Sequence, residues 1–215
     1  MNVSDGVEHL NKLLPLKARQ DALDSVLRNL HQEVLQSFTT TGRPLSRAQI
    51  AARPGAVNVD DMLSQLAADD LVVLSADRQD ITGAYPFTIE ERVHKVHVNG
   101  QDVYAMCALD ALSIAPMFDA STRILSRCHV TNTPVDIKMN AERILSAIPD
   151  DVHVGLRWQA TAGCAAKSLC MEMVYLKDAD TARQWQQQDS DNISIYSLDQ
   201  AVEFGAAFFR PLLNT

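Results

Sequence analysis

The 215-residue chain is poor in basic residues, with 19 Lys and Arg against 27 Asp and Glu and a formal net charge of −8. Affinity for nucleic acids rests mainly on Lys and Arg contacts to phosphate, so this balance argues against a nucleic-acid partner. No stretch approaches the roughly 20 apolar residues of a membrane span, and residues 1–9 contain no apolar signal-peptide core. We therefore expect a cytoplasmic protein without a membrane partner.

Cysteine is also scarce, with four in the chain and no pair spaced as Cys-x-x-Cys. Four are too few for a disulfide scaffold in a chain of this length, and a cytoplasmic protein keeps them as reduced thiols. The missing Cys-x-x-Cys spacing argues against a zinc ribbon. His94 and His97 do not form a metal pair on a strand, because positions i and i+3 point to opposite faces. Hydrophobic residues make up 47% of the chain, enough to bury a core.

The N-terminal part has the periodicity of helices. Apolar residues recur at spacings of three and four, and Ser46 and Asn58 stand where N-caps are expected. The predicted elements are helices over 17–38, 46–52 and 58–70, then a strand over 71–74 and an extended segment over 80–88. This order is that of a winged helix-turn-helix unit.

A winged helix suggests DNA binding, but the would-be recognition helix over 58–70 is acidic. It contains Asp60, Asp61, Asp69 and Asp70 and no Lys or Arg. A phosphate backbone would repel such a helix. We therefore interpret the winged-helix shape as a packing element and rank a DNA-binding regulator last among the candidate functions.

From residue 93 onward the pattern is that of strands with short helices between them. Asn99-Gly100 between two β-like runs is a strong hairpin signal, and Ser197 with Gln200 forms a capping-box pattern. We predict strands over 122–130, 134–139, 152–158 and 169–176, and helices over 108–115 (stopped by Pro116), 140–145, 180–187 and 197–209. The expected fold is α+β. A winged-helix-like N-terminal domain, residues 1–90, packs on a mixed β-sheet core with short helices, residues 91–215.

Cys107 and Asp110 are three residues apart and share one face if the segment is helical. Cys107 then lies at the N-terminus of a helix, where the dipole lowers the pKa of a thiol. With Cys170 as a distant second thiol, the set predicts capture of a soft metal by two thiolates beside a proton-carrying carboxyl. The plain alternative is that each Cys is a small buried apolar residue and Asp110 an ordinary first-turn acid.

Several segments together resemble the alkylmercury lyases, the organomercurial lyase family of mercury-resistant bacteria. They occur in the family's order from about residue 20 to the end: Gly42-Arg43-Pro44-Leu45-Ser46-Arg47, Tyr104-Ala105-Met106-Cys107-Ala108-Leu109-Asp110, Ser126-Arg127-Cys128 with Thr133-Pro134-Val135, Ser168-Leu169-Cys170 and, more weakly, Ala201-Val202-Glu203-Phe204-Gly205. The resemblance implies a winged-helix-like part joined to a mixed β-sheet core. It also implies protonolysis of a carbon–mercury bond, R–Hg⁺ plus H⁺ giving RH and Hg²⁺.

The resemblance further implies roles for single residues. Cys107 and Cys170 bind mercury, Asp110 contacts the metal and transfers the proton, and Cys128 is structural. It implies no organic cofactor, Hg²⁺ as the bound product, an external thiol for its release, and a mercuric reductase as the acceptor.

Three positions depart from the family pattern. Met106 stands where a bulky aromatic residue is expected, Met171 replaces a second adjacent Cys of some members, and Cys164 has no counterpart. We interpret Cys164 as an exposed spare thiol in preference to a metal relay. The alternative function is a non-catalytic paralogue that binds or senses a soft metal on the same scaffold. A third is a redox enzyme that forms a Cys107–Cys170 disulfide.

Overall fold

The structure, a computed structural model, describes residues 1–160 and 163–214. Its helices are α1 (Val3–Leu13), α2 (Leu16–Asp21), α3 (Ser25–Thr41), α4 (Arg47–Ala51), α5 (Val59–Ala68), α6 (Ala108–Phe118), α7 (Ala179–Gln186) and α8 (Leu198–Phe209). Three short 3₁₀ segments are η1 (Ala165–Lys167), η2 (Leu169–Glu172) and η3 (Arg210–Leu212). Within the described ranges, no helix combines the length and the apolar character needed to cross a membrane.

The strands form two sheets. They are β1 (Val73–Leu74), β2 (Ile81–Ala84), β3 (Phe87–Thr88), β4 (His94–Val98), β5 (Gln101–Ala105), β6 (Ser121–Arg127), β7 (Pro134–Asn140), β8 (Arg143–Ile148), β9 (His153–Arg157), β10 (Met173–Leu176) and β11 (Ile193–Ser197). The larger sheet has the order β1-β2-β3-β5-β4-β6-β7-β8, and the smaller has the order β10-β9-β11. The described strand pairs are antiparallel, so the sheets are antiparallel where a mixed sheet was predicted. The predicted α+β class is confirmed.

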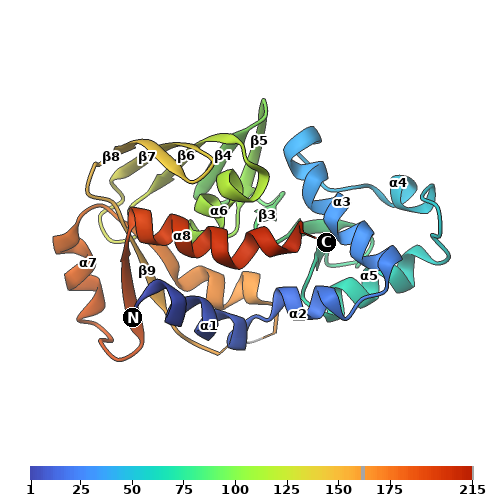
Figure 1. Ribbon diagram of the computed structural model, residues 1–215, viewed down its shortest axis with the longest axis horizontal. Coiled ribbons are helices and arrows are strands. Elements are labelled where there is room, and N and C mark those ends of the chain that lie inside the picture. Colours follow the sequence, from blue (N-terminus) through green and yellow to red (C-terminus); the bar gives the residue numbers. More distant parts are fainter. Residues whose placement is uncertain (161–162, 215) are drawn as a thin grey trace.

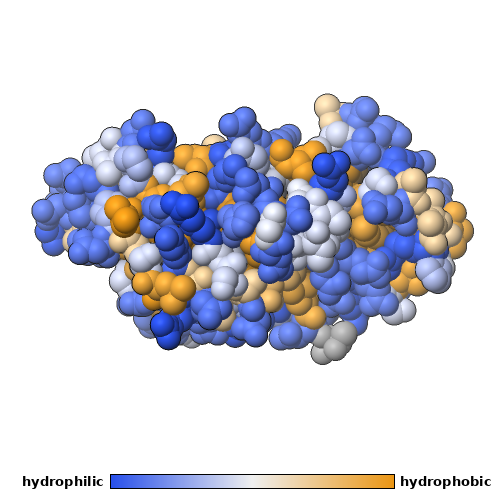
Figure 2. All heavy atoms as spheres, turned by 90° about the horizontal axis from the view of Figure 1, so that it is seen from above, coloured by the Kyte–Doolittle hydropathy of each residue, from blue (hydrophilic) through white to orange (hydrophobic). Residues whose placement is uncertain are grey.

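The elements spread along one long axis. In Figure 1, α3, α4 and α5 lie at one end and β6, β7, β8 and α7 at the other, while α8 runs between them with α1 alongside. Figure 2 views the molecule from above, and on this face apolar residues form separate small patches among hydrophilic ones. Such a mixture is the ordinary surface of a folded protein in water.

The predicted N-terminal helices are present, with two corrections. The single helix over 17–38 is wrong, because α2 ends at Asp21 and Asp24 caps a new helix, α3, by accepting the N–H of Leu27 at 2.9 Å. Helix α1 was not predicted. Ser46 and Asn58 cap α4 and α5 as expected. The winged-helix arrangement and the division of the chain between residues 90 and 91 stay predictions. The β1–β2–β3 strands continue into the main sheet through the pairing of β3 with β5.

The second half contains four corrections. Helix α6 does not stop before Pro116 but runs through it to Phe118, because burial of the helix from Ala108 to Met117 outweighs the roughly 3 kcal/mol that an interior proline costs. The predicted helix over 140–145 is wrong, because Ala141 turns the chain with a φ of 49° and β8 then pairs with β7. Residues 169–172 are η2 rather than strand, and β11 was not predicted. The Ser197–Gln200 capping box is confirmed.

Helix α6 is the central element of the core. It packs against α8 on one side and against β4, β5, β6 and β10 on others. Gly205 of α8 permits this close approach, since a Cβ there would lie 3.1 Å from Ser113 Cβ on α6. The Tyr175 hydroxyl of β10 donates to the carbonyl of Ala108, the first residue of α6, at 3.1 Å. These contacts fix the start of α6, where Cys107 and Asp110 lie.

Candidate active site

The structure brings the three predicted site residues together. One ligand atom of each of Cys107, Asp110 and Cys170 lies within 4.8 Å of the other two. All three side chains are buried, at 1%, 1% and 4% exposure respectively. Two sulfurs and a carboxylate oxygen at this separation are close enough to share one large soft metal ion. The sequence alone did not determine the distance between Cys107 and Cys170, and the structure shows that it is short.

Cys107 is the N-cap of α6, as its position in the sequence predicted. Its Sγ accepts the N–H of Asp110 at 3.3 Å, and its thiol donates to the Sδ of Met173 at 3.7 Å. The predicted lowering of its pKa is wrong. Burial raises the pKa of the Cys107 thiol, and the hydrogen bond with Cys170 and the charge of Asp110 add to the rise. Loss of hydration destabilises the thiolate more than the dipole at the helix N-terminus stabilises it.

Cys170 lies on η2, a different element from the helix that carries Cys107 and Asp110. Its hydrogen bond with Cys107 lowers the pKa of its thiol, but burial and the charge of Asp110 outweigh that bond, so the pKa is raised. Both thiols therefore carry their protons near neutral pH in the free protein. A metal that binds them must displace two protons, and those protons need an acceptor.

Asp110 lies in the first turn of α6, within 4.8 Å of both thiols. Burial raises the pKa of its carboxyl to about 7, although hydrogen bonds from Cys107 act to lower it. Its Oδ2 is buried and has no hydrogen-bond partner among the described residues. A carboxyl with a pKa near neutral and one uncommitted oxygen is suited to accept a proton and then return it.

The other two cysteines lie outside this cluster. Cys128 is buried after β6, and its N–H donates to the carbonyl of Thr133 at 2.8 Å. Cys164 is partly buried rather than exposed, and its Sγ lies 3.5 Å from the Tyr85 hydroxyl, so the interpretation as an exposed thiol is wrong. Its side chain is shielded because the loop that carries it folds against Tyr85.

The predicted separation of His94 and His97 is confirmed. His94 is buried and its Nδ1 contacts Ser126 Oγ at 2.8 Å, whereas His97 is exposed and its Nδ1 contacts Asp102 Oδ1 at 3.0 Å. The two rings therefore have separate partners on opposite faces of β4, and neither belongs to the cysteine cluster.

Sequence reasoning missed the residues that hold the Cys170 segment. The Tyr85 hydroxyl donates to Asp70 Oδ1 at 3.1 Å and accepts the N–H of Ala166 at 2.8 Å. Asp70 Oδ2 accepts the N–H of Ala165 at 3.2 Å. Both side chains therefore anchor η1, which immediately precedes η2. No local pattern points to them, because these contacts join residues far apart in the chain.

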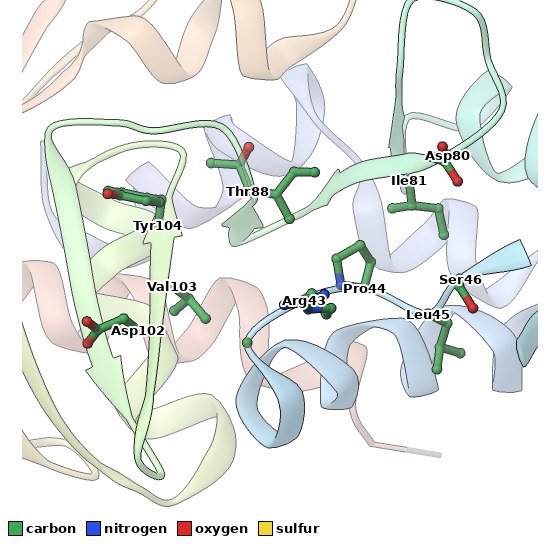
Figure 3. A pocket seen from close by; sticks show the side chains of 12 residues that line it. Arg43, Pro44, Leu45, Ser46, Asp80, Ile81, Thr88, Asp102, Val103 and Tyr104 are labelled. Carbon is green, nitrogen blue, oxygen red and sulfur yellow. The ribbon is translucent and has the colours of Figure 1, made fainter.

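Two cavities bear on the location of the chemistry. One of about 460 Å³ is lined in part by Met106, Cys170 and Met173, and so reaches one of the two thiols. Another, of about 410 Å³, lies where the segment Arg43–Ser46 faces β2 and β5 (Figure 3). Its lining offers the carboxylates of Asp80 and Asp102 but no sulfur or imidazole, and so it does not suit a soft metal. The first cavity reaches the cluster at Cys170, and we call it the access cavity.

Comparison with known proteins agrees with this geometry. The family model for MerB, alkylmercury lyase, matches residues 87–210, which include all three residues of the cluster. The alkylmercury lyase of Staphylococcus epidermidis is 25% identical over 173 residues, covering 80% of this chain and 77% of that protein. The alkylmercury lyase of Streptomyces lividans is 26% identical over 180 residues, covering 84% and 82%.

A solved structure of the mercury-bound form of MerB2 has the same fold. It superposes with a TM-score of 0.77 at 21% identity, covering 93% of this chain and 98% of that chain. The family match spans more than half of the chain and includes the buried cluster. The chain therefore belongs to the alkylmercury lyase family.

Proposed function

We propose that this protein is an organomercurial lyase that cleaves carbon–mercury bonds by protonolysis. In this proposal Cys107 and Cys170 bind mercury, and Asp110 contacts the metal and transfers the proton. The observation that carries it is the buried cluster, in which the ligand atoms of these residues lie within 4.8 Å of one another. Membership of the alkylmercury lyase family supports the same reaction.

The first step is capture of the organomercurial, written R–Hg–X, where X is a displaceable ligand such as a small-molecule thiolate. Cys170 attacks first, because it lines the access cavity while Cys107 does not. The Cys170 Sγ–Hg bond forms as the Hg–X bond breaks, and the thiol proton leaves with X as HX. Mercury is a soft cation for which thiolates are the best protein ligands, so this exchange is favourable.

The second step cleaves the carbon–mercury bond. Cys107 Sγ binds the same mercury and gives its proton to ionised Asp110, whose pKa of about 7 leaves part of the population ready to accept it. Two thiolates push electron density toward the carbon, which takes the proton from Asp110 as the Hg–C bond breaks. The products are RH and Hg(II) held by two thiolates, and the carboxylate is regenerated.

Product release then requires an external thiol. Two small-molecule thiols replace Cys107 and Cys170 on Hg(II) and return their protons to the protein sulfurs, which restores the starting state. No organic cofactor takes part in these steps. A mercuric reductase is the acceptor we propose for the released Hg(II). That MerB2 was solved in a mercury-bound form supports a scaffold of this kind as a holder of mercury.

The test is turnover of phenylmercury acetate by the purified, reduced protein in excess thiol. We expect equimolar benzene, measured by gas chromatography, and Hg(II), measured by cold-vapour atomic absorption. A protein that binds one equivalent of phenylmercury and releases no benzene would instead be the non-catalytic soft-metal-binding paralogue. Rapid formation of a Cys107–Cys170 disulfide with mild peroxide, without cleavage of phenylmercury, would select the redox enzyme.

A further inference from the structure

The access cavity is unusually rich in sulfur. Three of the chain's seven methionines, Met106, Met171 and Met173, line it together with Cys170. Met171 is 51% exposed at the surface, whereas Met106 and Met173 are 4% and 3% exposed in the interior. Beyond them, the thiol of Cys107 contacts Met173 Sδ at 3.7 Å. Sulfur atoms thus mark a route from the surface to both thiols.

The outer methionine is held in a defined position. Arg92 donates from one guanidinium nitrogen to Met171 Sδ at 3.3 Å and from another to Glu90 Oε2 at 2.7 Å. An exposed methionine usually samples several conformations because its side chain has three rotatable bonds. Here the pairing of Arg92 with Glu90 fixes the donor that holds the sulfur at the mouth of the cavity.

The inner methionines are accommodated by specific features of the fold. A Cβ on Gly83 would lie 2.6 Å from the terminal methyl of Met106, so glycine at this position makes room for the Met106 side chain. Met173 begins β10 directly after η2, and its sulfur is the acceptor for the Cys107 thiol. That hydrogen bond joins the Cys107 thiol, which lies behind the lining, to a side chain that lines the cavity.

We propose that the three thioethers form an entry path for organomercury compounds, and that Met173 is a positioning residue for Cys107; this rests on the proposed lyase function. A thioether is a soft, neutral ligand, so it adds weakly to the mercury of R–Hg–X without losing a proton. When Cys170 binds, the weak Met–Hg contact is given up and X leaves with the thiol proton. Met171 acts at entry, and Met173 acts on the second thiol.

The kinetic test compares single methionine-to-leucine variants, which keep an apolar side chain of similar size but remove the sulfur. With phenylmercury acetate in excess thiol, we expect Met171→Leu and Met106→Leu to raise KM severalfold with kcat retained. Met173→Leu should lower kcat severalfold instead. The matched control is Met139→Leu, a buried methionine of β7 outside the cavity, which should behave as wild type.

A second readout does not depend on turnover. In protein labelled with ¹³C at the methionine methyl groups, one equivalent of phenylmercury acetate should shift the resonances of Met106, Met171 and Met173 and leave that of Met139 in place.

If wild type turns over while all three variants match the Met139→Leu control, the entry path is refuted and the lyase function stands. If wild type is inactive yet these three resonances shift, the lyase function fails and the path remains as a mercurial-binding site. The path is also refuted if the resonances do not move.

Discussion

Cys107 and Cys170 lie in two regions of contrasting construction. Cys107 caps a regular helix, α6, which is buried between α8 and the sheet and does not line the access cavity. Cys170 lies on η2, a single 3₁₀ turn in the wall of that cavity. Its segment follows η1, which is held by hydrogen bonds that Ala165 and Ala166 donate to Asp70 and Tyr85 rather than by a sheet or a long helix.

The contrast assigns different tasks to the two sulfurs. A thiol in the cavity wall meets a ligand arriving from solvent, while a thiol at the start of a packed helix is fixed relative to Asp110, three residues later on the same helix. Capture needs access, whereas proton transfer needs a fixed geometry, since a misplacement of about 1 Å can cost roughly 10²-fold in rate. The construction of the two regions therefore matches the mechanism we propose, with capture at Cys170 and cleavage at Cys107 and Asp110.

The largest expected effect comes from removing either thiol. Cys107→Ala and Cys170→Ala should each lower kcat/KM for phenylmercury by on the order of 10³-fold or more, and the double variant should be no worse, because both sulfurs act on one mercury. The contrast between the two regions also predicts that the two single variants take up phenylmercury at different rates. Cys107→Ala should still take up phenylmercury rapidly at Cys170, while Cys170→Ala should take it up slowly.

Rapid mixing gives the rate of phenylmercury uptake. Peptide mapping by mass spectrometry identifies the cysteine that is modified. Cys164→Ala is the control, with activity close to wild type, because Cys164 lies outside the cluster. Equal uptake rates in Cys107→Ala and Cys170→Ala would contradict the assignment of first attack to Cys170.

The next largest effect is expected from Asp110→Asn, which keeps the shape of the side chain but cannot carry a proton. Loss of a positioned acid–base group typically costs about 10²–10⁴-fold in rate, and we expect kcat to fall by that range. Phenylmercury should still bind, since both thiols remain. Single-turnover release of benzene measures the effect, and cleavage at the wild-type rate would remove Asp110 from the mechanism.

The same carboxyl should also make stability depend on pH. Burial raises the pKa of Asp110 from 3.8 to about 7, so between these values the folded state keeps a proton that the unfolded state has released. The contribution of this group to the free energy of unfolding therefore falls by on the order of a few kcal/mol as pH rises through this window. Above the window the contribution is constant. Urea unfolding of wild type and Asp110→Asn should show a difference that grows from pH 4 to pH 7. A constant difference would contradict the raised pKa.

The two regions also differ in how far the sequence predicts them. The spacing of Cys107 and Asp110 and the cap of the following helix are local features, and the structure confirms both. The partnership with Cys170 depends on contacts across the core, and in the sequence it was indicated by the presence of a second thiol and by the family resemblance, not by any local spacing. The anchoring of η1 by Tyr85 and Asp70 has no local signal, because a hydroxyl and a carboxylate meet backbone N–H groups about 80 residues or more away.

Burial explains most of the remaining errors. The lowered pKa expected of Cys107 follows from its place on a helix, but the actual direction follows from loss of hydration, which local sequence does not reveal. Pro116 stays inside α6 for the same reason, because packing around the helix outweighs a missing hydrogen bond. A helix was predicted over residues 140–145, but Asn140 belongs to β7 and residues 143–145 belong to β8, which pairs with that strand.

A moderate effect is expected at the anchor of the Cys170 region. Tyr85→Phe leaves the N–H of Ala166 without its acceptor and removes the donor to Asp70 Oδ1, which should cost about 1–3 kcal/mol of unfolding free energy. The exposed Lys167 follows this anchor, so tryptic cleavage there should accelerate and KM should rise. Tyr104→Phe, at a less buried tyrosine of β5, is the control. Unchanged cleavage at Lys167 would show that the segment is held by other contacts.

The smallest effect is expected at the equivalent contact of the Cys107 region. Tyr175→Phe removes the hydroxyl that donates to the Ala108 carbonyl, but that carbonyl keeps its partner within α6, so no buried acceptor is orphaned. The loss should be only about 0.5–1.5 kcal/mol, with kcat and KM close to wild type. Urea unfolding and steady-state kinetics with phenylmercury measure both quantities. If Tyr175→Phe impaired turnover more than Tyr85→Phe, the helix would not be the self-supporting element that the contrast requires.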